Sequence, residues 1–216
     1  MLESSMGVNR DGAADAPKLS DGSFERLRFE GMSFDDRYKL LTGAVVPRPI
    51  AFVSSLNHDG SINAAPFSSF MIASVEAGYL AFSVGPGDRV EKETLRNVRR
   101  TREFVINTVS QDLAQEVQFC GDEHPPGTQK IAVARLQLVA SERIKTPRIA
   151  NTKIQFECGL HRIVRFGDSN MIVGEVLLMH AERGLVRNGK IDPLEYAPLG
   201  RIAGRNYCFV REIISV

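Results

Sequence analysis

The stretch VVPRPIAFVSSLNHDGSINAAPFSSF, residues 45–70, decides the predicted fold. Its two halves, VVPRPIAFVSSL and SINAAPFSSF, are rich in the apolar and β-branched residues that are typical of strands. Between them, Asp59-Gly60 supplies the positive φ angle that a tight hairpin needs. Pro66 has no N–H to donate, which favours a sheet edge or a strand end. The stretch therefore predicts two antiparallel strands joined across NHDG.

Short β-rich segments continue along the rest of the chain. We expect further strands in YLAFSVG, EFVINTV, ARLQLVAS, KIQFECGLHRIVRF, NMIVGEVLLMHAERGLV and NYCFVREIISV. Turn residues such as Asp168-Ser169-Asn170 and Asn188-Gly189 separate some of them, and VQFCGDEHPPGTQK is expected to be a loop. Strands do not alternate with helices as a Rossmann domain requires, so the pattern predicts a closed antiparallel barrel with one or two covering helices.

The charged segment RVEKETLRNVRRT interrupts the strands and predicts a surface helix, with Val90, Thr94, Leu95 and Val98 near helical spacing. A start at or near Thr94 would leave Lys92 in the preceding turn, where it can fold back toward an anion at the helix N-terminus. A start at Asp88, with a capping box, would place Lys92 and Thr94 on different faces. We prefer the start near Thr94.

Length and charge limit the classes of function. The chain has 216 residues, which suits one domain, and we expect residues 1–22 to form a mobile tail and residues 23–216 a single domain. Its 27 Lys+Arg and 26 Asp+Glu give a net charge of +1, which offers no global field for nucleic acid or an anionic membrane. No apolar run approaches the roughly 20 residues of a membrane helix, and a cytoplasmic location is expected.

The sequence contains no complete motif for a metal site, a phosphate-binding loop or a catalytic nucleophile. The histidines are scattered and the cysteines lack metal-ligand spacing, so we expect no metal site and free, mostly buried thiols. GLVRNGKI, residues 184–191, approaches a P-loop but ends in Ile191 where a hydroxyl is required, so a hairpin turn is the better interpretation. No catalytic dyad or nucleophile motif is present, so the chemistry of an enzyme would be carried by a bound organic cofactor.

Five segments, in this order and spacing, carry a resemblance to a known family: PRPIAFVSSLNHDGSINAAPFSSF, KETLRNVRRTREFVINTV, QFECGL, MIVGEVLLMH and PLGRIAGRNY. Together they resemble the flavin reductase-like, FMN-binding split-barrel family, which includes flavoredoxins and the reductase components of two-component monooxygenases. The resemblance covers roughly residues 30 to 210. It implies a mainly β fold, a six-stranded antiparallel Greek-key barrel with a few peripheral helices, and usually a homodimer with FMN near the interface.

The resemblance also implies a set of cofactor-binding residues. Backbone and hydroxyl groups at two strand ends would line the flavin ring, a lysine with nearby hydroxyls would hold the phosphate, and one asparagine would support the helix start. The residues carried over are Arg48, Ser54, Ser55, Asn63, Ala64, Ala65, Ser68, Ser69, Lys92, Thr94, Asn97, Arg201 and Tyr207.

Some of these residues have a second interpretation that the sequence leaves open. Arg48 could be a solvated arginine held extended by its flanking prolines. Ser68 and Ser69 could be simple strand-end hydroxyls, and Arg201 could pair with a carboxylate at a subunit contact. After the Pro-Pro-Gly loop, relatives often carry an acidic and aromatic pair, whereas this chain has Gln129-Lys130-Ile131, which leaves the molecule approaching the flavin open.

The activity implied is an FMN-binding oxidoreductase that reduces flavin with NADH or NADPH and supplies reduced FMN or electrons to a partner, such as a flavin-dependent monooxygenase. Hydride transfer between two stacked rings depends on positioning and exclusion of water, and so needs no catalytic dyad. Two alternatives remain: a flavin-binding electron carrier with little NAD(P)H turnover, and a flavin-dependent oxidoreductase with its own organic substrate.

Overall fold

The computed structural model describes residues 22, 24–86, 91–125 and 127–216. Internal contacts divide the chain into two units, and the second unit runs from Tyr38 to Val216. The boundary falls within helix α1, Phe34–Ala44. Apart from Gly22, the predicted tail lies outside the described residues. The single domain expected from residue 23 stays a prediction.

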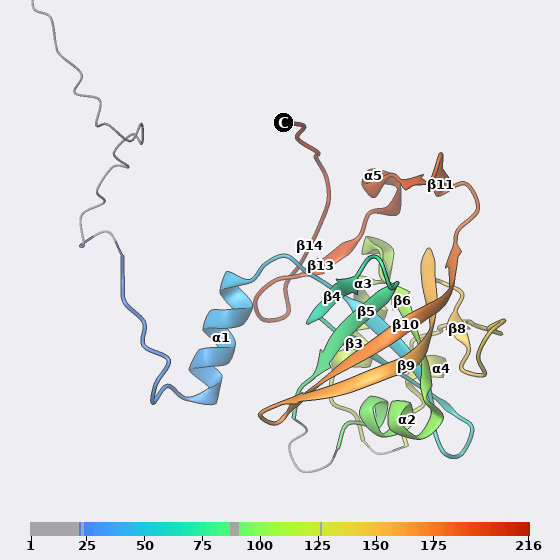
Figure 1. Ribbon diagram of the computed structural model, residues 1–216, viewed down its shortest axis with the longest axis horizontal. Coiled ribbons are helices and arrows are strands. Elements are labelled where there is room, and N and C mark those ends of the chain that lie inside the picture. Colours follow the sequence, from blue (N-terminus) through green and yellow to red (C-terminus); the bar gives the residue numbers. More distant parts are fainter. Residues whose placement is uncertain (1–21, 23, 87–90, 126) are drawn as a thin grey trace, which may run out of the picture. The chain divides into compact units, whose positions relative to one another are not determined.

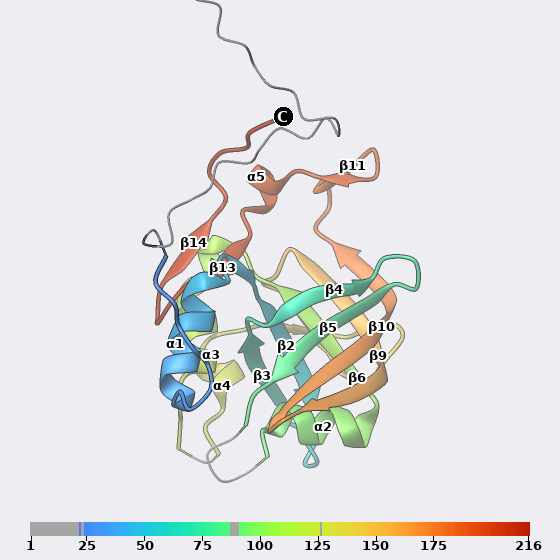
Figure 2. The ribbon, with the colours of Figure 1, turned by 60° about the vertical axis from the view of Figure 1, so that its left-hand side comes forward.

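A curled antiparallel sheet dominates the second unit (Figures 1 and 2). Among the described residues it has seven strands in the order β3-β2-β6-β9-β10-β5-β4. Their bounds are β2 Ala51–Leu56, β3 Ile62–Phe67, β4 Phe70–Ser74, β5 Tyr79–Val84, β6 Glu103–Thr108, β9 Ile154–Phe166 and β10 Ser169–Ala181. The mainly β, antiparallel fold that the sequence predicts is confirmed.

Smaller elements surround the sheet. The helices after α1 are α2 Glu93–Thr101, the 3-10 turn η2 Gln111–Leu113, α3 Ala114–Gly121, α4 Lys130–Val133 and α5 Pro193–Tyr196. A separate sheet joins β1 Arg48–Pro49, β13 Leu199–Arg201 and β14 Tyr207–Phe209. Two short hairpins pair β7 Leu138–Val139 with β8 Arg148–Ile149, and β11 Val186–Arg187 with β12 Lys190–Ile191.

The opening hairpin forms as predicted, but both of its strands are shorter than expected. The first strand begins at Ala51, and Arg48–Pro49 forms β1 in a separate sheet. Gly60 has a φ of 85° in the turn between β2 and β3, which a glycine adopts at little steric cost. SINAAPFSSF is not one strand, however, because the chain breaks at Ser68-Ser69 and continues as β4. β3 and β4 form opposite edges of the sheet. The large sheet has seven strands among the described residues, where the family resemblance implies six.

Strand β2 is buried on both faces. Ala51 and Val53 belong to the core inside the curled sheet, together with Leu95 and Val98 of α2. Phe52, on the opposite face of β2, belongs to a second core that α3, α4 and β13 also supply. Burial on both faces explains why AFVSSL does not alternate strictly between apolar and polar residues.

The predicted loop VQFCGDEHPPGTQK is wrong in its first part, because residues 117–121 belong to helix α3. Val117 and Cys120, one helical turn apart, are both buried in the second core. The close approach of α3 to β3 is visible at Gly121, where an added Cβ would lie 2.9 Å from Cγ of Pro66. The helix ends at Gly121, before the Pro-Pro-Gly sequence at residues 125–127.

Two further local predictions are confirmed, the hairpin turn at residues 188–189 and the free thiols. At the predicted turn near residue 188, Asn188 and Gly189 have φ angles of 52° and 73° between β11 and β12, so GLVRNGKI is a hairpin and no phosphate loop. All three cysteines are free, with Cys120 and Cys158 buried. The described residues contain no group of metal-ligating side chains and no helix long and apolar enough to cross a membrane.

A buried carboxylate organises the segment between β7 and β8. Glu157 on β9 is fully buried and accepts hydrogen bonds from the backbone N–H groups of Glu142 at 2.9 Å and Arg143 at 2.7 Å. His180 Nε2 lies 2.6 Å from the same carboxylate. Burial alone would raise the pKa of Glu157, but these hydrogen bonds together with His180 hold it below the ordinary value.

Candidate functional site

Helix α2 begins close to the preferred position. Its first helical residue is Glu93 and its N-cap residue is Lys92, so Thr94 lies in the first turn. Glu91 and Lys92 precede the helix, and Asp88, the alternative start, lies with Val90 outside the described residues. The Lys92 side chain makes no capping hydrogen bond to the helix. Its ammonium group and the first N–H groups of α2 are therefore available to an anion at this end.

Two hydrogen bonds connect the α2 start to the β2–β3 hairpin. Asn63 Nδ2 donates to Thr94 Oγ1 at 2.9 Å, and both residues are buried. Asn97 Nδ2 donates to Ser55 Oγ at 3.1 Å and to Asn57 Oδ1 at 2.7 Å. The support that the family resemblance assigns to Asn97 is thus a direct contact between α2 and β2. The helix end is held in place by buried amides.

A cavity of about 490 Å³ opens beside this helix end, and we call it the α2 cavity. Its walls come from β3, the α2 start, the end of α3 and the segment that follows. The lining residues are Asn63, Ala65, Pro66, Phe67, Glu91, Lys92, Glu93, Thr94, Arg96, Cys120, Gly121, Asp122, Glu123 and Lys130. An apolar wall, formed by Ala65, Pro66 and Phe67, therefore adjoins a charged one.

The charges around the α2 cavity are partly paired. Arg99 contacts Glu91, and Arg205 donates to Asp122 Oδ2 at 2.9 Å. The hydrogen bond from Arg205 is the largest cause that holds the pKa of Asp122 below its ordinary value. Lys92 and Lys130 form no ion pair with any residue that the structure describes. Two ammonium groups without an ion-pair partner among the described residues therefore border the cavity.

The strand period separates the predicted residues of the hairpin. Ser55 is opposite Asn63 and Ser54 is opposite Ala64, so the two pairs face opposite sides of the sheet. Ser54 Oγ donates to the carbonyl of Pro147 at 2.8 Å and is fully buried. Ala64 belongs to the second core. Of the predicted hairpin residues, Asn63 and Ala65 line the α2 cavity, while the side chains of Ser54, Ser55 and Ala64 are engaged in the interior.

Arg48 is nearly buried and binds backbone carbonyls. Nη1 donates to the carbonyls of Thr42 and, at 2.9 Å, Val45, and Nη2 donates to the carbonyl of Ile202 at 3.2 Å. Nε lies 3.4 Å from Ser68 Oγ. Burial lowers the pKa of Arg48. The guanidinium thus fastens the end of α1 to the segment after β13, and it is no solvated arginine.

The predicted serines differ in their surroundings. Ser68 lies beside Arg48 at the break between β3 and β4 and is partly buried. Ser69 is exposed, and its carbonyl accepts a hydrogen bond from the backbone of Ser83 at 3.1 Å. Neither of them lines the α2 cavity. Their assignment to the phosphate stays a prediction.

Arg201 and Tyr207 form a second group that leads back to the α2 cavity. The guanidinium carbon of Arg201 lies 4.6 Å from the ring centroid of Tyr207, and Nη1 also contacts the tyrosine hydroxyl. Both side chains bind Gln118 Oε1, at 3.0 Å and 2.9 Å. Gln118 Nε2 in turn donates to Asp122 Oδ1 at 2.6 Å. Arg201 therefore pairs with an amide and an aromatic ring, and this network ends at a residue of the cavity wall.

The end of α3 contributes cavity residues that the sequence did not predict. Gln118, Asp122 and Glu123 lie in a segment expected to be a loop, and no local spacing connects them with Lys92. Lys130 belongs to the triplet singled out as a departure from the family pattern, and it borders the α2 cavity. The cluster of charges in GDEH is the only sequence signal that could have indicated a wall of this kind.

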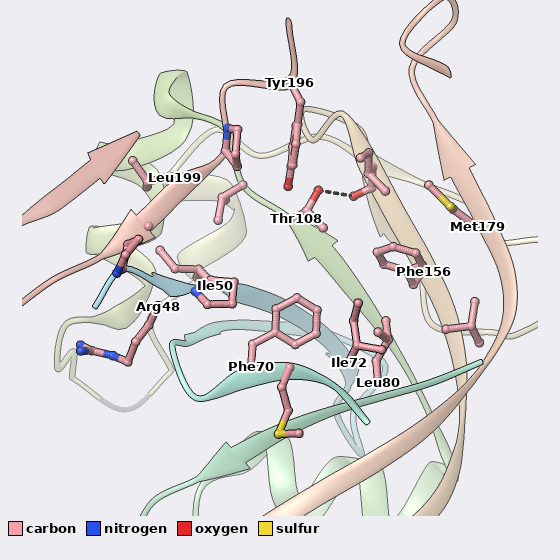
Figure 3. A pocket seen from close by; sticks show the side chains of 18 of the residues that line it. Arg48, Ile50, Phe70, Ile72, Leu80, Thr108, Phe156, Met179, Tyr196 and Leu199 are labelled. Atoms are coloured by element: carbon pink, nitrogen blue, oxygen red, sulfur yellow. Dashed lines mark hydrogen bonds between the residues drawn. The ribbon is translucent and has the colours of Figure 1, made fainter. Parts of the chain in front are cut away.

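A larger cavity of about 900 Å³ lies at the other end of the curled sheet, and we call it the barrel-mouth cavity. Figure 3 shows Phe70, Ile72, Leu80 and Phe156 around it, with Tyr196 directed into it from above. The Thr108 hydroxyl, also in this cavity, donates to the carbonyl of Ile154 at 3.1 Å. Burial raises the pKa of Tyr196. Most of the surrounding side chains are apolar.

A curled antiparallel sheet with a lysine at a helix N-terminus, beside a cavity with one apolar wall, defines a β-barrel protein suited to an anionic ligand with an apolar part. Comparison with known sequences identifies the family within this class. The family model described as "Flavin reductase like domain" matches residues 43–201, which is more than half of the chain. The chain belongs to the flavin reductase-like family of flavin-binding oxidoreductases.

Solved structures agree with this family. The nitrilotriacetate monooxygenase component B from Bacillus cereus is 29% identical, with a TM-score of 0.85 over 90% of this chain and 99% of that one. The 2-nitrobenzoate 2-nitroreductase from Pseudomonas fluorescens is 30% identical, with a TM-score of 0.81 over 89% and 95%. A Shewanella frigidimarina protein described as a flavin reductase with a split-barrel domain is 12% identical, with a TM-score of 0.77 over 87% and 94%, and supports the split-barrel fold alone.

The residues of the α2 cavity fit a flavin mononucleotide by their chemistry. Lys92 and the first N–H groups of α2 provide donors for a phosphate. Pro66 and Phe67 provide apolar surface for a planar ring. The cavity volume of about 490 Å³ also lies within the range of small-molecule sites. Carboxylates on the rim would repel an anion, whereas Lys92 and Lys130 would attract one.

Proposed function

We propose that this chain is an FMN-binding oxidoreductase that reduces flavin with NADH or NADPH and supplies reduced FMN or electrons to a partner. The observation that carries the proposal is the ammonium group of Lys92 at the start of α2, which has no ion-pair partner among the described residues and lies beside the apolar end of β3. Membership of the flavin reductase-like family supports it independently.

Residues of this chain bind and orient the cofactor in the proposal. Lys92 and the α2 N-terminus bind the phosphate, and the buried Asn63–Thr94 hydrogen bond keeps the helix end against β3. The wall of Ala65, Pro66 and Phe67 excludes water from one face of the ring. Bound FMN supplies the redox chemistry itself, by accepting electrons from a nicotinamide and passing them on. Positioning is then the main contribution of the protein.

The similarity to a monooxygenase component B supports a flavin-dependent monooxygenase as the partner in a two-component system. A homodimer with FMN near the subunit interface is also part of the proposal, as the family resemblance implies. The cytoplasmic location expected from the sequence stays a prediction.

A second candidate is a flavin-dependent oxidoreductase with its own organic substrate. The 30% identity to a 2-nitrobenzoate 2-nitroreductase over 89% of this chain favours it specifically. In that case a nitroaromatic compound, and not free flavin, would accept the electrons. The barrel-mouth cavity is large enough for such a compound, but its contacts do not select one.

The absorbance spectrum of the purified protein tests cofactor binding, and NADH or NADPH oxidation tests the reaction. Turnover that rises with added FMN supports a flavin reductase. Turnover that depends on added 2-nitrobenzoate, with flavin at a fixed saturating concentration, supports the second candidate. Tight FMN binding without turnover would indicate an electron carrier, and failure to bind any flavin would contradict the proposal.

A further inference from the structure

Lys130 brings a second ammonium group to the α2 cavity, on a different element from Lys92. It is the first residue of α4, whereas Lys92 precedes α2, and both helices contact β3. Burial raises the pKa of the Cys120 thiol to about 11, and the charge of Lys130 partly opposes this rise. Lys130 therefore lies near the end of α3, on the wall of the cavity that α3 and α4 build.

This wall adjoins the apolar part of the cavity. An added Cβ at Gly121 would lie 2.9 Å from Cγ of Pro66, so the end of α3 packs directly on β3. Pro66 and Phe67 are the residues proposed to contact the flavin ring. Lys130 is half-buried, and a lysine with a covered stem keeps its ammonium group in solvent. Its charge is therefore available to a ligand beside the proposed ring position.

Glu123 adds a carboxylate to the same wall. It lies in the segment between α3 and α4, is exposed and lines the cavity. Three of the four carboxylates of the cavity are paired with arginines, namely Glu91 with Arg99, Glu93 with Arg96 and Asp122 with Arg205. Glu123 is the fourth and has no ion-pair partner among the residues that the structure describes. The wall therefore presents one ammonium group and one carboxylate to a ligand.

An ammonium group and a carboxylate on one wall fit a nucleotide. The ammonium group binds phosphate through charge-assisted hydrogen bonds, and the carboxylate accepts hydrogen bonds from the hydroxyl groups of a ribose. In a nicotinamide dinucleotide each ribose is joined directly to the diphosphate, so neighbouring groups of one molecule meet both side chains. A simple inorganic anion would be attracted by Lys130 but repelled by Glu123.

We propose that Lys130 and Glu123 bind the hydride donor and select NADH over NADPH. Lys130 binds the diphosphate, and Glu123 accepts hydrogen bonds from the hydroxyl groups of the adenosine ribose. In NADPH a phosphate occupies the 2′-hydroxyl of this ribose, which removes a donor to Glu123 and brings a like charge toward it. The inference rests on the proposed function, because it names the donor of that reaction and the residues that select it.

Separate elements keep the two proposed anions apart. In the proposed function the FMN phosphate binds at Lys92 and the start of α2, while the diphosphate of the donor binds at Lys130 on α4. Arg96, the remaining cation of the cavity, lies 4.0 Å from Glu93 and is engaged there. The nicotinamide end of the donor then extends toward Pro66 and Phe67, where the two rings must approach to about 3–3.5 Å for hydride transfer.

Calorimetric titration of the FMN-saturated protein with NAD⁺ and NADP⁺ tests the selection without turnover. The native chain should bind NAD⁺ at least about ten-fold more tightly than NADP⁺. Glu123→Gln should remove most of this difference, mainly by improving the binding of NADP⁺. Glu76→Gln is the matched control, because Glu76 is exposed and does not line the cavity. Equal affinities in the native chain, or an unchanged ratio in Glu123→Gln, would overturn the inference.

Lys130→Ala tests the contact with the diphosphate. It should weaken NAD⁺ and NADP⁺ alike, by roughly 10- to 150-fold, and leave the dissociation constant of FMN within about two-fold. Lys130→Arg keeps the charge and should restore most of the affinity, and exposed Lys190→Ala should change nothing. A Lys130→Ala protein that loses FMN but not riboflavin would place Lys130 on the flavin phosphate. Loss of FAD alone, with FMN and NAD⁺ unaffected, would assign the second phosphate to the flavin, and either result contradicts the inference.

FMN-dependent turnover separates the two proposals. A chain that reduces FMN equally well with NADH and NADPH contradicts this inference and leaves the proposed function intact. A chain that binds no flavin contradicts the proposed function, whereas NAD⁺ selectivity that depends on Glu123 in the same flavin-free chain would still support the donor site. Native FMN affinity in Glu123→Gln and Lys130→Ala would show that both variants are folded, so their altered dinucleotide binding cannot result from misfolding.

Discussion

Asn63 Nδ2 donates a hydrogen bond of 2.9 Å to Thr94 Oγ1, and so joins the edge strand β3 to the first turn of α2 across 31 positions of sequence. The contact is buried on both sides. It holds Lys92, the residue before the helix, at the border of the α2 cavity. The position of the proposed phosphate-binding group therefore depends on a hydrogen bond between elements far apart in the chain.

Lys92→Ala should weaken FMN binding without weakening riboflavin binding. Loss of one charge-assisted contact to the phosphate removes about 1.5–3 kcal/mol, which is roughly a 10- to 150-fold increase in the dissociation constant. Fluorescence titration with both ligands measures it. Lys190→Ala, an exposed lysine on β12, is the control and should change neither constant. Equal losses for FMN and riboflavin would show that Lys92 does not bind the phosphate.

Arg48→Lys should lower the stability of the protein and leave FMN affinity within about two-fold. Lysine lacks the planar fork with which Arg48 reaches carbonyls of the α1 end and of the segment after β13, so we expect a loss of about 1–3 kcal/mol. Urea unfolding gives the free energy, with exposed Arg187→Lys as the control. Unchanged stability together with a ten-fold loss of FMN affinity would instead make Arg48 a ligand of the flavin.

Glu157→Gln should reduce the stability at neutral pH by about 2–5 kcal/mol, because its carboxylate accepts hydrogen bonds from the backbone of Glu142 and Arg143. The pKa of Glu157 is lowered in the folded state. Its stabilising contribution is therefore complete above the unfolded pKa of about 4.3 and is lost as the pH falls through the folded pKa.

Unfolding free energies between pH 7 and pH 3 check this dependence. The decline toward acid pH should be smaller in Glu157→Gln than in the wild type, whereas the exposed Glu76→Gln should follow the wild type. Parallel pH curves for all three proteins would exclude Glu157 as a source of acid sensitivity.

Gly174→Ala should destabilise the barrel by about 1–3 kcal/mol through overpacking. An added Cβ at Gly174 would lie 2.4 Å from Cζ of Phe104 and 3.2 Å from Cβ of Cys158. Phe104 is fully buried, and its ring meets that of Phe82 edge to face at 5.5 Å, so it has little room to move.

Gly43→Ala is the matched control for this overpacking. An added Cβ at Gly43 meets nothing within 4 Å, and its position in α1 should make the variant slightly more stable. Thermal unfolding of both variants gives the comparison. A Gly174→Ala protein as stable as the wild type would mean that the core around Phe104 relaxes freely.

Local features of the structure were predictable where their cause lies within a few residues. The turn at Gly60 and the hairpin at Asn188-Gly189 follow from residues that tolerate positive φ angles. The start of α2 near Thr94 follows from the change to helical spacing. The break at Ser68-Ser69 was not predictable, because the β-rich pattern continues through it and only pairing to different strands separates β3 from β4.

In the candidate site, too, the sequence predicted what depends on near neighbours and not what depends on strand pairing. The sequence placed Lys92 and Thr94 together at a helix start, because their separation is local. It grouped Ser54 with Ser55 and Ala64 with Asn63, although neighbours in a strand face opposite sides. Since both faces of β2 are buried, hydrophobic alternation could not indicate which side meets the cavity.

The sequence by itself determined the antiparallel β-barrel, the helix that interrupts it and, through five segments in register, the flavin reductase-like family. Only the tertiary structure decided that Arg48 fastens backbone carbonyls, that Gln118 links Arg201 to Asp122, and that an apolar cavity lies open at the barrel mouth. Strand periods and turns arise from each residue and its near neighbours. Which side chains share a cavity depends on how distant strands pair and curl, and no local pattern records that pairing.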